Sequence, residues 1–206
     1  LAIEQRNRIG DIMSKIFFVL GKSCSGKDTI FQYLRENKEL NLRTVVGYTT
    51  RPMRVGETEG VEYHFVSENR LKEMKEEGKV IEFREYNTVH GKWSYFTADD
   101  GQIDIGKENY LYIGTLESYN DMVKYYGREV VVPLYIEVEN GERLERAVKR
   151  ERQQREPKYA ELCRRFLADE EDFKEENIAK AGISKRYYNK DLDECISEIV
   201  ETIQKI

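Results

Sequence analysis

Residues 16–29 read IFFVLGKSCSGKDT, and this stretch decides the fold of the 206-residue chain. The apolar run Ile16–Leu20 predicts a buried strand, and the spacing G-x-x-x-x-G-K that follows is typical of a phosphate-binding loop. Gly21 and Gly26 allow successive backbone N–H groups to point at a polyphosphate, and Lys27 supplies a mobile positive charge. The alternative, a chance glycine-rich turn, does not explain the strand before the loop and the helix after it. The stretch therefore predicts a nucleotide-binding enzyme.

The loop departs from the usual pattern directly after its lysine. Asp28 stands where a Ser or Thr is usual, and a hydroxyl follows only at Thr29. Cys24 is interpreted as a small residue that fills a tight loop, or else as a thiol made reactive by the positive potential. The residues expected to contact ATP here are Gly21, Lys22, Ser23, Cys24, Ser25, Gly26, Lys27, Asp28 and Thr29.

Strands and helices alternate along most of the chain, which predicts an α/β fold with a parallel sheet flanked by helices. The predicted strands are 16–20, 110–113, 130–136 and a short one near 185–188, and the predicted helices are 27–37, 115–126, 140–153, 159–177 and 191–206. Residues 47–97 break this alternation, with strand-like stretches at 62–66 and 79–86 around a helix at 68–77. They predict an inserted, mostly β subdomain.

Composition narrows the class of protein. Hydrophobic residues make up 39% of the chain and charged residues 35%, and no apolar run approaches the roughly 20 residues that span a membrane. The three cysteines lack metal-ligand spacing, so we expect a reducing, cytoplasmic location. Residues 1–12 show no apolar periodicity and are interpreted as a disordered extension before Met13, a plausible natural start.

Charge is spread unevenly along the chain, whose net charge is −5. Residues 143–165 hold nine Lys or Arg and four Glu, which gives this stretch +5 and leaves −10 elsewhere. A local basic block in an acidic protein favours a small anionic ligand over nucleic acid, because DNA binding needs a wide basic face. The acidic run 169–172 is interpreted as a solvated helix face.

A second motif runs from Thr49 to Phe65, TTRPMRVGETEGVEYHF. Together with the loop, it resembles the guanylate kinase family, and the resemblance covers residues 15–206. It implies a P-loop core (13–46 and 98–206), an inserted subdomain that binds the nucleoside monophosphate (47–97), and a helical lid at about 140–165. The implied reaction transfers the γ-phosphoryl group of ATP to GMP, with Mg²⁺ as cofactor, and yields ADP and GDP.

Two arginines in this motif are suited to a phosphate monoester. Arg51 and Arg54 lie three apart around a proline, so two guanidinium forks can reach one phosphate. By resemblance both arginines and Tyr63 hold the phosphate of GMP, and Glu57 orients the arginines. Glu82 matches the glutamate that reads guanine, since a carboxylate accepts from N1–H and the 2-amino group together.

The basic block matches the lid of the family. Arg146 and Arg150 lie four apart, hence on one helix face, and Arg165 matches an arginine of the next helix. With Lys27 they are expected to stabilise the transferred phosphoryl group and to exclude water. Asn189 resembles a residue near the adenine of ATP.

The chain departs from the family pattern on the acceptor side. Gly47 replaces a serine, the segment 87–97 is rewritten, with Ser94 and Tyr95 as possible substitutes in the GMP site, and Tyr112–Gly114 replaces an acidic pair. Asp28 is therefore predicted to bind Mg²⁺, with Glu117 as a weaker candidate.

These departures leave two alternatives open. A kinase of this fold could act on a different nucleotide or another phosphorylated small molecule, or the chain could be a binding module that has lost transfer. The partners expected are ATP and GMP, with no nucleic acid and no membrane, and the chain acts as a monomer or a dimer.

Overall fold

A computed structural model describes residues 14–88 and 91–206. The predictions for residues 1–13 and for Val89 and His90 lie outside this part of the chain. In the described part, no helix has the length and apolar character needed to cross a membrane.

Five parallel strands form the first sheet, in the order β2–β7–β1–β8–β9. They are β1 (Ile16–Leu20), β2 (Leu42–Thr44), β7 (Asn109–Ile113), β8 (Val131–Glu137) and β9 (Arg186–Tyr188). Strand β1 lies in the centre, and every one of its residues is fully buried. This explains why its sequence is continuously apolar rather than alternating.

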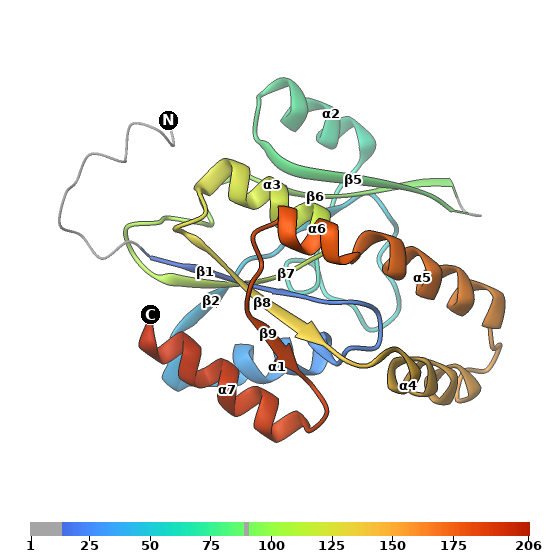
Figure 1. The fold of residues 1–206 in the computed structure, drawn as a ribbon. Coiled ribbons are helices and arrows are strands. Elements are labelled where there is room, and N and C mark those ends of the chain that lie inside the picture. The colour runs from blue at the N-terminus through green and yellow to red at the C-terminus, as the bar shows by residue number, and fades with distance from the viewer. Residues whose placement is uncertain (1–13, 89–90) are drawn as a thin grey trace.

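Helices cover both faces of this sheet (Figure 1). Those on the sheet are α1 (Lys27–Glu36), α3 (Leu116–Tyr126), α6 (Glu175–Lys180) and α7 (Leu192–Lys205), and a short 3-10 turn spans Lys38–Leu40. Helices α4 (Asn140–Arg152) and α5 (Tyr159–Asp172) instead extend away from the ends of the strands. Phe17 of β1 belongs to a core cluster with α1 and α7, whereas Phe18 belongs to one with α3 and α6. The two faces of a single strand thus organise the core.

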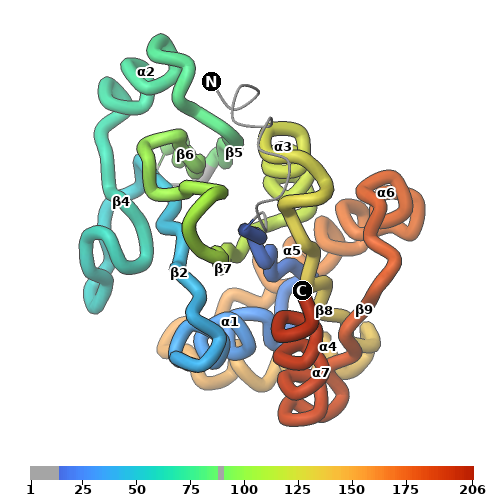
Figure 2. The backbone as a smooth tube through the Cα atoms, turned by 90° about the vertical axis from the view of Figure 1, so that its left-hand side faces the viewer, coloured from blue at the N-terminus to red at the C-terminus, as the bar shows by residue number. Residues whose placement is uncertain are grey.

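A second sheet is built from residues 48–98 and lies apart from α1 and α7 (Figure 2). Its strands, β3 (Tyr48–Thr49), β4 (His64–Phe65), β5 (Val80–Thr88) and β6 (Gly91–Ala98), run in the order β4–β3–β6–β5. Helix α2 (Glu68–Glu76) packs Leu71 and Met74 against Phe96 and Ala98. The opposite face of β5 and β6 is left for other contacts.

The predicted α/β fold is confirmed, and most predicted elements lie within a few residues of the observed ones. The single helix predicted over 159–177 is wrong, because Phe173 turns into the core and stacks on Tyr135, with ring centroids 5.7 Å apart. Lys174 is then extended and separates α5 from α6. The prediction also missed β2, β3 and β6, and β6 matters most for the site described below.

Candidate functional site

The phosphate-binding loop joins β1 to the first turn of α1. Gly26 has a φ of +86°, and a Cβ at this position would collide with the side-chain amide of Asn189. That amide donates a hydrogen bond of 2.8 Å to the carbonyl oxygen of Ser25. Asn189, predicted to lie near adenine, is thus a buried residue that holds the loop in shape.

Lys27 begins α1 with its ammonium group close to the loop. Its Nζ lies 3.5 Å from the carboxylate of Asp28, whose side chain is 79% exposed. Thr29 is also exposed, whereas the hydroxyl of Ser25 is buried and has no hydrogen-bond partner among the described residues. The helix N-terminus, the lysine and a buried free hydroxyl make this loop suitable for an anionic ligand.

Asp28 fits a magnesium ion that is shared with a nucleotide. Within residues 14–88 and 91–206, no group of three His, Cys, Asp or Glu side chains lies close enough together to hold a metal ion without other ligands. Mg²⁺ needs no such cage, because it is commonly bound by one or two carboxylates together with substrate phosphates and water. An exposed carboxylate at the end of the loop meets that requirement.

Arg146 of α4 lies next to the loop, beside Asn189 and Gly26. Its Nη2 donates to the carbonyl oxygen of Asn189 at 2.9 Å and also to Glu142. Its Nη1 lies 4.0 Å from the position that a Cβ of Gly26 would occupy. The structure therefore brings Arg146, Asn189 and Lys27 to one loop.

The acidic end of α5 also binds the loop, so the prediction of a solvated face at 169–172 is wrong for two of its residues. Asp169 accepts from the backbone N–H of Ser23 at 2.8 Å, and Glu170 accepts from Lys22 at 2.6 Å. Arg143, counted within the basic block, is 1% exposed and pairs with Glu170 at 3.3 Å. These contacts connect α4 and α5 to the loop.

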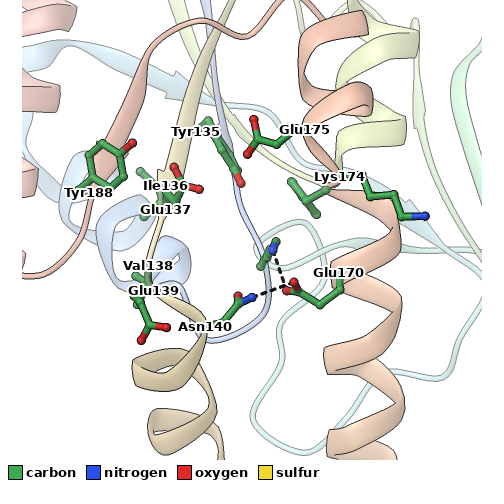
Figure 3. Close-up of a pocket in the computed structure, with 12 residues that line it drawn as sticks. Tyr135, Ile136, Glu137, Val138, Glu139, Asn140, Glu170, Lys174, Glu175 and Tyr188 are labelled. Atoms are coloured by element: carbon green, nitrogen blue, oxygen red, sulfur yellow. Dashed lines mark hydrogen bonds and ion pairs between the residues drawn. The ribbon is translucent and has the colours of Figure 1, made fainter.

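A pocket of about 580 Å³ lies beside the loop, between β8, β9 and the ends of α4 and α5. Figure 3 shows Glu170 of α5 facing Asn140 of α4, to which it is hydrogen bonded at 2.8 Å. Four glutamates but only two lysines line this pocket. Because negative charge dominates, we expect phosphate groups at the loop rather than here.

The other two lid arginines are placed elsewhere. Arg150 and Arg165 are both exposed and line a surface pocket of about 540 Å³ with Lys158. Arg165 lies 3.7 Å from Glu161 of its own helix. The structure therefore groups these two arginines with each other but not with Lys27.

In the segment between β3 and β4 of the second sheet, the buried Arg51 forms an ion pair with the partly buried Glu57. The Nη1 and Nη2 atoms of Arg51 donate to the two carboxylate oxygens of Glu57. This hydrogen bonding lowers the pKa of Glu57 to about 2, despite the opposing effect of burial. The Arg51 guanidinium lies 5.3 Å from the centroids of the Tyr63 and Phe65 rings.

The remaining predicted phosphate contacts surround this pair. The ring centroid of Tyr95 lies 5.6 Å from that of Tyr63, and the two rings pack edge to face. Burial raises the pKa of Tyr63, so the Tyr63 hydroxyl stays neutral and can donate a hydrogen bond. Arg54 has an exposed side chain, and its backbone N–H donates to Glu57 at 2.7 Å.

Glu82 lies on the same face of this sheet and is 1% exposed. Arg84 donates to it through Nε at 3.0 Å and Nη2 at 3.1 Å. The hydroxyls of Thr97 and Tyr112 lie 2.9 and 3.2 Å from Glu82 Oε1. Burial alone would lower the pKa of Arg84, but the negative charge of Glu82 outweighs it and raises that pKa.

Ser94, predicted to contact GMP, is placed differently from Glu82. Successive side chains of a strand point to opposite faces, and Thr97 faces Glu82 whereas Phe96 faces α2. Ser94 shares the face of Phe96, and its backbone N–H and carbonyl bind Thr50 and Thr49. Its neighbour Tyr95 points to the side of Arg51 and Arg84.

Gly114 and Gly47, two positions at which the chain departs from the family pattern, differ in how much space a side chain would have. A Cβ on Gly114 would collide with the hydroxyl of Ser118 and would lie 2.7 Å from Cζ of Phe18, so no acidic side chain fits there without rearrangement. A Cβ on Gly47 would meet its nearest neighbour, the carbonyl oxygen of Phe96, at 3.4 Å. Crowding therefore explains the glycine at 114 but not the one at 47.

Comparison with known proteins identifies the family. The sequence model of the guanylate kinase family matches residues 13–206. This chain belongs to the guanylate kinase family. The match covers both the phosphate-binding loop and the second sheet.

Individual guanylate kinases resemble the chain over shorter stretches. The guanylate kinase of Malacoplasma penetrans (strain HF-2) is 37% identical over 90 residues, which are 43% of this chain and 44% of that protein. That of Aliivibrio fischeri (strain ATCC 700601 / ES114) is 35% identical over 100 residues, 45% of this chain and 48% of that protein. The aligned stretches thus span less than half of these relatives.

A solved guanylate kinase from Anaplasma phagocytophilum shares the fold. It superposes with a TM-score of 0.61 over 95% of this chain and 87% of that chain, at 21% identity. At this identity the likeness supports the fold alone.

Three residues around Glu82 were missed as candidates from the sequence. Arg84 could have been found from the two-residue period that places it on the face of Glu82. Thr97 is the register partner of Glu82, which requires the pairing of β5 with β6. Tyr112 was noted only as a departure from the acidic pattern of the guanylate kinase family, although its hydroxyl lies against Glu82.

Proposed function

We propose that this protein transfers the γ-phosphoryl group of ATP to GMP and yields ADP and GDP. The observation that carries the proposal is the presence, in one chain, of a phosphate-binding loop and a separate buried arginine–tyrosine group suited to a phosphate monoester. A single ligand would need only one of these sites. Two anion sites, one of them at a P-loop, favour phosphoryl transfer between two nucleotides.

On the donor side, Lys27 and the backbone N–H groups of the loop bind the ATP phosphates. Arg146 lies close enough to add a second positive charge, and Arg150 and Arg165 approach when α4 and α5 close over the loop. Positive groups that face the transferred phosphoryl stabilise its equatorial oxygens in a loose transition state. Closure also keeps out water, which would otherwise accept the phosphoryl group.

On the acceptor side, Arg51, Tyr63 and Tyr95 bind the phosphate of GMP, and Arg54 adds a mobile charge from the exposed turn. Glu57 holds Arg51 in place before the ligand arrives, which reduces the entropy lost on binding. No general base is required, because a phosphate monoester is already anionic near pH 7.

Magnesium is the cofactor that this site needs, and Asp28 would hold it together with the ATP phosphates. Bound there, the ion would neutralise phosphate charge. The negative charge of Asp28 next to a polyphosphate favours binding of ATP only in its magnesium form. We place the reaction in the cytoplasm, where the three cysteines stay free.

Steady-state formation of diphosphate from ATP and GMP, AMP or UMP tests the proposal. We expect turnover of GMP to exceed that of the other two by on the order of 10²-fold or more, and to vanish when EDTA removes Mg²⁺. Binding of GMP without any ADP formation would instead indicate a binding module, and preferred turnover of AMP or UMP would indicate a different acceptor.

A further inference from the structure

The face of the second sheet that carries Glu82, Arg84 and Tyr95, with Tyr112 of β7 against it, is called the acceptor wall. It contains a charged pair rather than a lone carboxylate. Glu82 and Arg84 lie two residues apart on β5 and point to the same face of the sheet, and their side chains are 0% and 12% exposed. Arg84 makes a forked contact through Nε and Nη2 with both carboxylate oxygens. Glu82 therefore meets a ligand only as half of this pair.

The hydrogen bonds at Glu82 leave little capacity for a ligand. Oε1 lies 3.1 Å from Arg84 Nη2, 2.9 Å from the Thr97 hydroxyl and 3.2 Å from the Tyr112 hydroxyl. The two hydroxyls also lie 2.5 Å from each other, and because each has one proton, at least one of them donates to Oε1. With Nη2, that donor fills both lone pairs of this oxygen.

The second oxygen is only half used. Oε2 accepts one hydrogen bond from the described residues, that of Arg84 Nε, so one lone pair is left. The carboxylate can therefore accept one donor from a base but not two. Reading both N1–H and the 2-amino group of guanine would require Glu82 to give up an existing partner.

Arg84 offers hydrogen-bond donors beside that remaining acceptor. A guanidinium has five N–H groups, and Glu82 uses two of them. The charge of Arg84 also acts on the nearby Tyr63, Tyr86, Tyr112 and Glu117. Arg84 is also the register partner of Tyr95, so it lies next to the group that binds the phosphate.

At position 114, directly after β7, the first sheet provides no carboxylate for the 2-amino group. Gly114 occupies the position where an acidic residue is expected from the family pattern, and Phe18 and Ser118 fill the space that a side chain would need. The Glu82–Arg84 pair thus presents one free acceptor position and a guanidinium to a base.

We propose that Arg84 and Glu82 read the acceptor base as a unit, in which Arg84 donates to the 6-oxo group and Glu82 Oε2 accepts from N1–H. The site then takes 6-oxopurine nucleoside monophosphates with or without a 2-amino group, so IMP is a substrate beside GMP. Adenine is rejected at both positions, because it has a donor at position 6 and an acceptor at N1. This specificity rests on the proposed function.

The kinetic test compares GMP, IMP and AMP with the full chain and saturating ATP·Mg²⁺. We expect kcat/KM for IMP to lie within about fivefold of that for GMP, because no partner of the 2-amino group is lost, and kcat/KM for AMP to be lower by on the order of 10⁴-fold. A hundredfold or greater loss with IMP would overturn the inference while leaving GMP phosphorylation intact.

Variants separate base reading from a structural role. Arg84→Gln should lower kcat/KM for GMP and IMP together by about ten- to a hundredfold and shrink their advantage over AMP, and Arg84→Lys should restore part of that advantage. Arg43→Gln is the matched control, because Arg43 on β2 also pairs with a glutamate, Glu108, at 2.8 Å, but is exposed and lies outside the site. If Arg84→Gln changes all three nucleotides by the same factor, Arg84 is only structural.

Equilibrium binding keeps the two proposals distinguishable. If no monophosphate is turned over, the proposed transfer fails, and titration of GMP, IMP and AMP into the ATP-free protein still tests base reading. Similar affinities for GMP and IMP, with AMP much weaker, support it, whereas binding of GMP alone overturns it.

Discussion

The donor and acceptor sides of this molecule differ in how they are encoded. The phosphate-binding loop is continuous in sequence, from β1 to α1, and departs from its usual pattern only at Asp28. The acceptor wall is assembled from β3, β5, β6 and β7, which belong to two different sheets. The comparison teaches that the proposed phosphoryl transfer would depend on a local motif, whereas the choice of acceptor would depend on long-range strand pairing that can be changed without touching the loop.

Removal of the loop ammonium should break the donor side most severely. Lys27→Ala is expected to lower kcat by on the order of 10²–10³-fold, because a positive group that faces the transferred phosphoryl is lost, while GMP affinity stays nearly unchanged. Steady-state kinetics and GMP titration measure this. Lys38→Ala, in the exposed 3-10 turn, is the control and should behave as wild type. A kcat within threefold of wild type would argue against the loop as the donor site.

Replacement of the buried arginine should break the acceptor side alone. Arg51→Lys keeps the positive charge but loses the guanidinium that donates two hydrogen bonds at once. We expect the KM for GMP to rise about ten- to a hundredfold, with ATP affinity unchanged. Arg70→Lys is matched, since Arg70 pairs with Glu73 on the surface of the same subdomain. An equal loss of ATP affinity would show that the two sides are not separate.

The tight junction at the end of β7 can be tested by adding one methyl group. Gly114→Ala places a Cβ against Phe18 and Ser118, and overpacking of this kind costs about 1–3 kcal/mol of the free energy of unfolding. Gly106→Ala is the control, because its Cβ would meet only Asp104 Oδ1, at 3.6 Å. Urea unfolding measures both. Equal stability of the two variants would remove the steric reason for the missing acidic residue.

The smallest effect concerns the pH dependence of the Arg51–Glu57 pair. Folding lowers the pKa of Glu57 to about 2 from its ordinary value of 4.5, so the pair stabilises the fold above about pH 4.5 and loses that contribution as the pH falls toward 2. The difference in urea midpoint between wild type and Glu57→Gln should therefore shrink between pH 6 and pH 3. A difference that grows toward low pH would have the wrong sign.

The sequence predicted the first sheet well because its signals are local. The run Ile16–Leu20 is apolar throughout, and Asp191 caps α7 by accepting from the N–H of Glu194 as the pattern indicates. The break after Asp172 was missed because it depends on the stacking of Phe173 on Tyr135, which are 38 positions apart in the sequence.

The acceptor site was predicted only in part for the same reason. Arg51, Glu57 and Tyr63 lie in one motif, and the structure groups them. Thr97 meets Glu82 only through the register of β5 and β6, and Tyr112 reaches it from the other sheet. Without that register, Ser94 could not be assigned to the face of α2.

A molecule that joins guanosine and adenosine through five phosphates tests most directly whether the loop and the acceptor wall form one site. We expect calorimetry to show one molecule bound per chain, with an affinity on the order of 10²-fold or more above that of ATP alone, because both sides are engaged at once. Lys27→Ala and Arg51→Lys should each remove that gain. An affinity no better than that of ATP, unchanged by Arg51→Lys, would contradict the account.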